Sequence, residues 1–95
     1  MYVAETIDAL PHTDLLSPDC LGALVSLVYN RGPSFTAKGP RYAEMRAIRL
    51  HMVTGETEKI PGELRAMKKI WRDKGLDGLI YRRELEARLF EEGLG

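Results

Sequence analysis

Cysteine is almost absent from this chain of 95 residues, which has one, Cys20. A single cysteine excludes an internal disulfide and a metal site built from cysteines. The two histidines, His12 and His51, lie far apart in the sequence and have no further ligands at a metal-binding spacing. We therefore expect neither a metal ion nor a cofactor.

Long apolar runs are also missing. No stretch approaches the roughly 20 apolar residues that a membrane-spanning helix needs. The N-terminus lacks the basic start and the apolar run of a secretory signal. By default the sequence predicts a cytoplasmic chain without a membrane partner.

Charge is balanced overall but unevenly placed. Residues 1–30 hold four acids and no lysine or arginine, so all 14 basic residues lie beyond them. Basic runs and stacked aromatic residues, which nucleic-acid-binding domains show, are absent, and aromatic residues make up only 7% of the chain. We expect no nucleic-acid partner and interpret the later charges as a solvated helical surface.

Strand-forming patterns are lacking too, because the few β-branched residues do not alternate with polar ones. Apolar residues make up 44% of the chain and recur at helical spacing, which predicts one all-α domain over residues 1–95. Glycine and proline divide it into about five helices. We place them at 2–10, from 18 to about 31, from 40 to 54, from 61 to about 74, and from about 76–78 to 92, with Gly93 beyond the end of the last.

The second of these helices carries the strongest signals. Ser17 is a suitable N-cap, Pro18 fits the first helical position, and Gly32 followed by Pro33 ends the helix. Between these ends the segment 21–29 is apolar nearly all round, which is typical of a buried helix. The sequence therefore predicts a compact bundle around this central helix.

Candidate catalytic groups are few. Glu5 and Asp14 form the early carboxylate pair that a glycosidase would need, but a short helix and a loop should leave both solvated. Cys20 lies in the first turn of a helix, where the helix dipole can lower the pKa of a thiol, as a nucleophile requires. Neither histidine, however, has an evident reason to lie beside it as a base. Packing explains Cys20 better, and we predict no catalytic residue.

Two segments are less ordinary. In 29–35 the buried helix gives way to a polar loop, a common geometry for the wall of a cleft. In 78–83 the adjacent Arg82 and Arg83 lie near the start of a helix, where they oppose its dipole, so another contact should compensate for them.

These two segments carry a family resemblance. Residues 21–32, LGALVSLVYNRG, look like the buried-helix motif of the phage-type lysozymes, or endolysins. Trp71 and residues 78–90, GLIYRRELEARLF, resemble the closing motif of that family. The order and separation of the two motifs also match, so the resemblance covers roughly residues 15–92.

The resemblance implies a lysozyme-like C-terminal helical lobe, which forms one wall of a peptidoglycan-binding cleft. By analogy, it implies that Asn30 and the Ser34–Phe35 loop face the glycan and that Arg83 reaches toward the other lobe. Residues 40–45 depart from the family's usual stretch. We predict substrate contacts by Asn30, Arg31, Ser34 and Tyr42. The family's catalytic glutamate, aspartate and threonine belong to an N-terminal lobe whose glycine-rich strand signature is not found here. We therefore expect peptidoglycan binding without hydrolysis by this chain alone, and a separate N-terminal catalytic lobe as a partner.

The alternative is a helical oligomerisation or interaction module that keeps the fold and has lost the substrate. Loss of the other lobe would expose an apolar surface, which favours a homo-oligomer.

Overall fold

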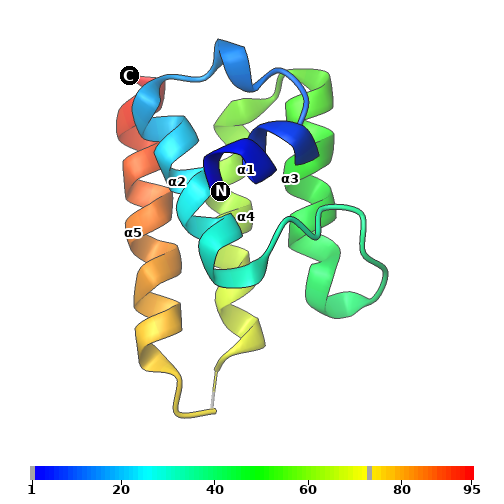
Figure 1. Ribbon diagram of the computed structural model, residues 1–95. Coiled ribbons are helices and arrows are strands. Elements are labelled where there is room, and N and C mark those ends of the chain that lie inside the picture. Colours follow the sequence, from blue (N-terminus) through cyan, green and yellow to red (C-terminus); the bar gives the residue numbers. More distant parts are fainter. Residues whose placement is uncertain (1, 73) are drawn as a thin grey trace.

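The computed structural model describes residues 2–72 and 74–95, and every regular element in this part of the chain is helical (Figure 1). The α-helices are α1 (Tyr2–Ala9), α2 (Pro18–Arg31), α3 (Ala43–Thr54), α4 (Ile60–Ala66) and α5 (Asp77–Leu94). Short 3-10 helices cover Thr13–Leu15, Pro40–Tyr42, Thr57–Lys59 and Met67–Ile70. The predicted all-α bundle of about five helices is confirmed.

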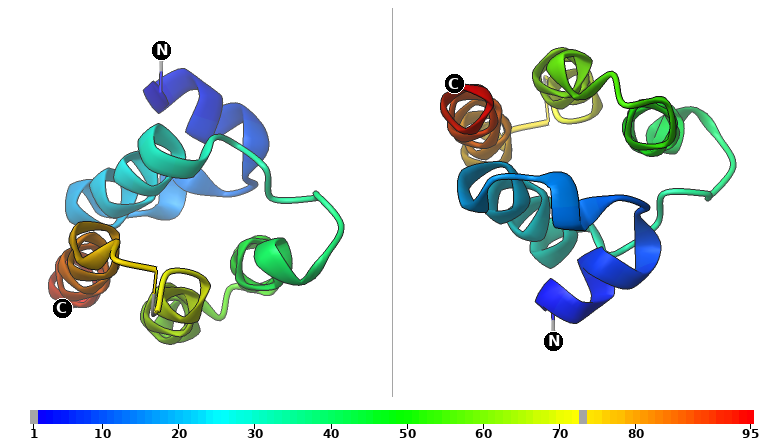
Figure 2. Two further views of the ribbon diagram at one scale, coloured as in Figure 1. Left: turned by 90° about the horizontal axis from the view of Figure 1, so that it is seen from below. Right: turned by 90° about the horizontal axis from the view of Figure 1, so that it is seen from above.

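Helices α2, α3, α4 and α5 form a ring when the bundle is seen along its length. Figure 2 shows α2, α5, α4 and α3 following one another, with residues 32–39 leading from α2 to α3. The closest packing joins α2 to α5, then α4 to α5. Leu24, Leu27, Met45, Leu64 and Phe90 are among the fully buried core residues, and Phe35 of the 32–39 segment is buried with them.

The ends of α2 are built as the sequence predicts. The Ser17 side chain accepts a hydrogen bond from the backbone N–H of Cys20 at 3.2 Å, and Pro18 takes the first helical position. At the other end Gly32 adopts φ 78°, a conformation that favours glycine, and its N–H bonds back to the carbonyl of Val28. These two ends fix where the polar residues after Tyr29 emerge.

The burial of α2 differs from the prediction, and α1 buries only one side chain. Helix α2 is not buried all round, since Tyr29 is 57% exposed and α5 shares the central position. Of the apolar residues spaced along α1, only Leu10, just beyond its end, is buried, while Val3 and Ile7 are about half exposed. The buried side chain of α1 is Thr6, whose hydroxyl bonds to the Tyr2 carbonyl at 2.6 Å and so needs no outside partner.

The later helices differ from prediction at their ends. Pro40 opens a 3-10 turn rather than α3 itself, and the fourth helix changes to 3-10 form at Met67, well before Gly75. Gly93 lies inside α5 rather than beyond it. A Cβ on Gly93 would lie 2.5–2.8 Å from Ser17 and Cys20, so this glycine allows α5 to approach the start of α2.

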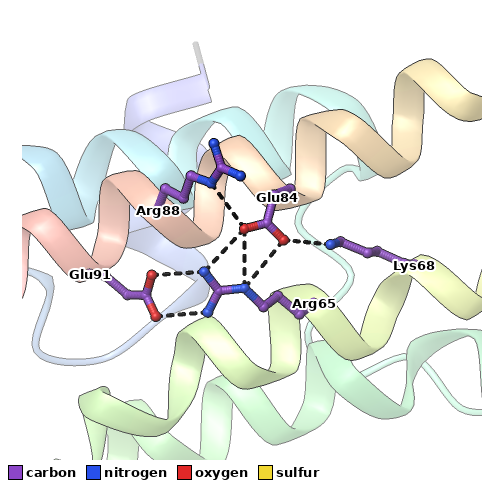
Figure 3. A network of polar contacts seen from close by, with 5 residues as sticks. All are labelled: Arg65, Lys68, Glu84, Arg88 and Glu91. Atoms are coloured by element: carbon purple, nitrogen blue, oxygen red, sulfur yellow. Dashed lines mark hydrogen bonds and ion pairs between the residues drawn. The ribbon is translucent and has the colours of Figure 1, made fainter.

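Charged side chains join α4 to α5 across the surface (Figure 3). Arg65 of α4 contacts Glu84 at 3.2 Å and Glu91 at 2.7 Å, and Lys68 contacts Glu84 at 2.5 Å. Arg88, one turn along α5, also contacts Glu84 at 3.1 Å. The Glu86 side chain is outside this network, because it is buried and lies 4.0 Å from Arg82.

We find no helix in the described residues that is long and apolar enough to cross a membrane.

Candidate functional site

The two unusual segments of the sequence meet at one end of the bundle. Polar and aromatic side chains from α2, the turn before α3, the end of the fourth helix and α5 gather there, and we call them the polar cluster. Its members are Ser26, Asn30, Arg31, Tyr42, Trp71, Arg83 and Glu86.

Arg83 is the centre of the polar cluster. Its Nη1 donates to Oδ1 of Asn30 at 2.9 Å, and its Nη2 donates to Oε2 of Glu86 at 2.8 Å. The Ser26 hydroxyl donates to the same Glu86 oxygen at 2.5 Å. Nε of Arg83 and Oε1 of Glu86 are 2.6 Å apart but are not aligned for a hydrogen bond, so this contact is an ion pair only. For Arg83, the compensating contacts predicted from the sequence are therefore inside the domain.

Burial sets the electrostatics of this pair. It raises the pKa of Glu86 and lowers the pKa of Arg83, and in each case the partner's charge opposes the shift. A raised carboxyl pKa is a common property of catalytic acids. Glu86 is nevertheless only 3% exposed, and Ser26 and Arg83 occupy its oxygens, so a substrate cannot reach it. We therefore assign Glu86 a structural role.

Arg31 connects the polar cluster to two aromatic rings. Its guanidinium carbon lies 4.8 Å from the ring centroid of Tyr42 and 5.6 Å from that of Trp71, which are cation–π distances. Desolvation lowers the pKa of Arg31, with Tyr42 acting against the shift. Its Nη1 is buried and has no hydrogen-bond partner among the described residues. Arg31 is thus held in place with a hydrogen-bond donor still unused.

The structure brings together three of the four predicted contact residues. Asn30 and Arg31 end α2, and Tyr42, distant in sequence, lies against Arg31. Ser34 is partly exposed in the loop between them, beside the buried Phe35 that anchors this loop. Arg83, for which the resemblance implies a contact with another lobe, is fully buried and bonds inside the domain.

Four residues of this region were not predicted from the sequence. Glu44 and Lys69 pair at 2.9 Å beside the polar cluster, and Ser26 and the buried acid Glu86 belong to it. The sequence offered one signal for Glu86: it follows Arg83 by three positions, on the same side of a helix. Nothing in the sequence indicated that Glu44 and Lys69, rather than other charged residues near them, would form an ion pair.

The early candidates for catalysis lie elsewhere. Glu5 and Asp14 are exposed, on α1 and on the 3-10 turn that follows it. Cys20 is buried, and its thiol lies 3.3 Å from the carbonyl of Phe90. In residues 2–72 and 74–95 we find no group of three or more possible ligands that could hold a metal ion.

Comparison with known proteins adds no family to this description: no family model, curated protein or solved structure matches the chain.

Proposed function

We propose that this domain binds peptidoglycan, as one wall of a cleft whose catalytic groups belong to a separate lobe. The observation that carries the proposal is the contact of Arg31 with the rings of Tyr42 and Trp71, next to the hydrogen bond between Asn30 and Arg83. Aromatic rings beside a few fixed polar groups are the usual composition of a site for a polar organic ligand. The same residues belong to, or lie between, the two motifs that resemble phage-type lysozymes.

Each of these residues has a part in the proposal. Tyr42 and Ser34 are partly exposed and would contact the glycan directly. Arg31, whose Nη1 is buried, would supply positive charge from behind the rings of Tyr42 and Trp71. Asn30 already accepts from Arg83 through its oxygen, so only its amide N–H groups are left to bind a ligand.

Co-sedimentation with purified cell-wall sacculi tests this proposal. The protein should pellet with sacculi, and Tyr42→Ala should weaken the binding, because it removes both the ring and the support of Arg31. Tyr81→Ala is the matched control, since Tyr81 is an exposed tyrosine of α5 at 61% exposure. Equal binding by the two variants would show that the protein binds sacculi through another surface. No binding by the wild type would overturn the proposal.

Hydrolysis is tested separately, by release of dye from labelled sacculi. We expect no release by this chain alone, because Glu5 and Asp14 are solvated and Glu86 is inaccessible. Release that Glu5→Gln abolishes would make the chain an enzyme. An intact phage-type lysozyme serves as the positive control.

A second candidate, a module that self-associates, has its own observation. Tyr2, Val3 and Ile7 of α1 and Tyr29 of α2 are each about half exposed, and the rings of Tyr2 and Tyr29 are in edge-to-face contact at 4.9 Å. A second copy of the chain could cover these side chains. Light scattering after gel filtration tests this: a dimer that Ile7→Ser disrupts, from a protein that ignores sacculi, would favour the module over the peptidoglycan-binding lobe.

A further inference from the structure

A pocket of about 400 Å³ lies beside the polar cluster and shares none of its lining with the four predicted contact residues. Its walls come from the turn before α3, the end of the fourth helix and the segment leading into α5. The lining residues are Pro40, Arg41, Lys69, Ile70, Trp71, Lys74 and Leu76. The volume is within the range of ligand-binding pockets, roughly 300–1,000 Å³.

The lining has two parts of different chemistry. Arg41, Lys69 and Lys74 are cations, and no described residue of the lining carries a carboxylate. Of these three, Lys69 has a partner, Glu44, at 2.9 Å, while its own side chain stays about half exposed. The rest of the lining is apolar and includes the side chain of Trp71.

The charged groups beside the pocket leave Arg41 and Lys74 without a carboxylate partner among the described residues. Glu44 is nearly buried and uses one oxygen on Lys69, while its other oxygen has no hydrogen-bond partner among the described residues. The guanidinium carbon of Arg31 lies 5.6 Å from the Trp71 ring centroid and adds positive charge behind the pocket, whereas the charge of Arg83, at 5.4 Å, is balanced by Glu86. An anion entering the pocket would therefore meet a positive potential.

We propose that this pocket binds an organic acid: a ligand with a carboxylate that meets Arg41, Lys69 and Lys74 and an apolar group that lies on Trp71, Ile70 and Leu76. Arginine and lysine are the usual partners of carboxylates, and the apolar wall excludes a ligand that is charged throughout. This site goes beyond the proposed function and does not depend on it. The acid is either a free molecule or a group carried on the cell wall.

Trp71 provides a direct signal, because it is the only tryptophan of the chain and lines the pocket. Its fluorescence is measured during titration with 3-phenylpropionate, and in parallel with 3-phenylpropanol, which has the same apolar part but no charge. We expect a saturable change with the acid and binding about tenfold weaker with the alcohol, since each exposed ion pair contributes about 0.2–1 kcal/mol.

The double variant Arg41→Met/Lys74→Met tests which cations are responsible. Both side chains are exposed, so the fold should survive, and the acid should bind about five- to tenfold more weakly. The control Lys38→Met/Arg49→Met makes the same change in net charge at two exposed residues outside the lining, and should leave binding unchanged. Equal binding of acid and alcohol, equal losses in both variants, or no saturable change would each overturn the proposal.

The source of the acid follows from competition. If excess 3-phenylpropionate releases the protein from sacculi, the acid is carried on the cell wall. If it binds without releasing the protein, the pocket serves a free acid. If the fluorescence titration succeeds and sacculi are not bound at all, the peptidoglycan proposal fails and the pocket stands.

Discussion

Arg83 on α5 donates a 2.9 Å hydrogen bond to Oδ1 of Asn30, the penultimate residue of α2. The two residues are 53 positions apart and belong to the two motifs of the sequence that resemble the phage-type lysozymes. Packing alone therefore accounts for part of the pattern: one motif supplies a buried arginine, and the other supplies the hydrogen-bond acceptor for it. Arg31 and Tyr42, which contact each other, take no part in this hydrogen bond.

The buried pair of Arg83 and Glu86 should behave as a unit. Arg83→Met leaves Glu86 buried without its partner, and we expect a loss of about 3–5 kcal/mol in the free energy of unfolding. The double variant Arg83→Met/Glu86→Leu removes both charges and should recover most of this loss. Urea denaturation measures both. A loss below about 1 kcal/mol for the single variant would show that the pair does not need both members.

The ion-pair network between α4 and α5 should make stability depend on pH. Hydrogen bonds from Arg65 and then Lys68 lower the pKa of Glu84 to about 2, from a usual value of 4.5. Since the folded-state pKa is the lower one, Glu84 stabilises the fold above about pH 4.5, and this stabilisation is lost as the pH falls towards 2. At neutral pH Glu84→Gln should cost about 1–2 kcal/mol at low salt, and less in high salt.

Thermal melts between pH 2 and pH 7 check the role of Glu84. The variant should show a flatter pH dependence than the wild type. Glu92→Gln, at an exposed position of the same helix, is the matched control and should keep the wild-type curve. A wild-type slope in Glu84→Gln would place the pH dependence elsewhere.

Gly93 should not accept a side chain. A Cβ there would lie 2.8 Å from the backbone nitrogen of Cys20, so Gly93→Ala should destabilise the domain by about 1–3 kcal/mol in spite of alanine's better helix propensity. Gly78 lies in the first turn of the same helix with open space around it, and Gly78→Ala should stabilise by up to about 1 kcal/mol. Chemical denaturation of the two variants compares them directly, and stabilisation by both would contradict the close contact between α5 and α2.

The same glycine shows where sequence reasoning reaches its limit. Local signals were sufficient for the start and end of α2, because Ser17, Pro18 and Gly32 act on their own helix. Gly93 also has the appearance of a local stop signal, but its role is to let Cys20 and Ser17 approach, and that contact is visible only in three dimensions. Val3 and Ile7 are similar: their spacing predicts a helix correctly and says nothing about whether another helix covers them.

In the candidate site, too, some residues could be predicted from the sequence and others depend on contacts made only in the folded chain. The sequence predicted Asn30, Arg31 and Tyr42 as contact residues, and in the structure Tyr42 lies against Arg31, the neighbour of Asn30. It could not show that Arg83 is turned inward onto Glu86, because burial at that position depends on the packing of α5 against α2. It also could not reveal the pocket, whose cations come from three separate segments.

The most direct test of the central claim is a binding isotherm of the protein on purified sacculi, measured by depletion from solution. We expect saturable binding that Tyr42→Ala weakens and Tyr81→Ala leaves unchanged, with both variants folded by circular dichroism. A wild-type protein that stays in solution at every sacculus concentration would contradict the claim that this helical domain is a peptidoglycan-binding wall.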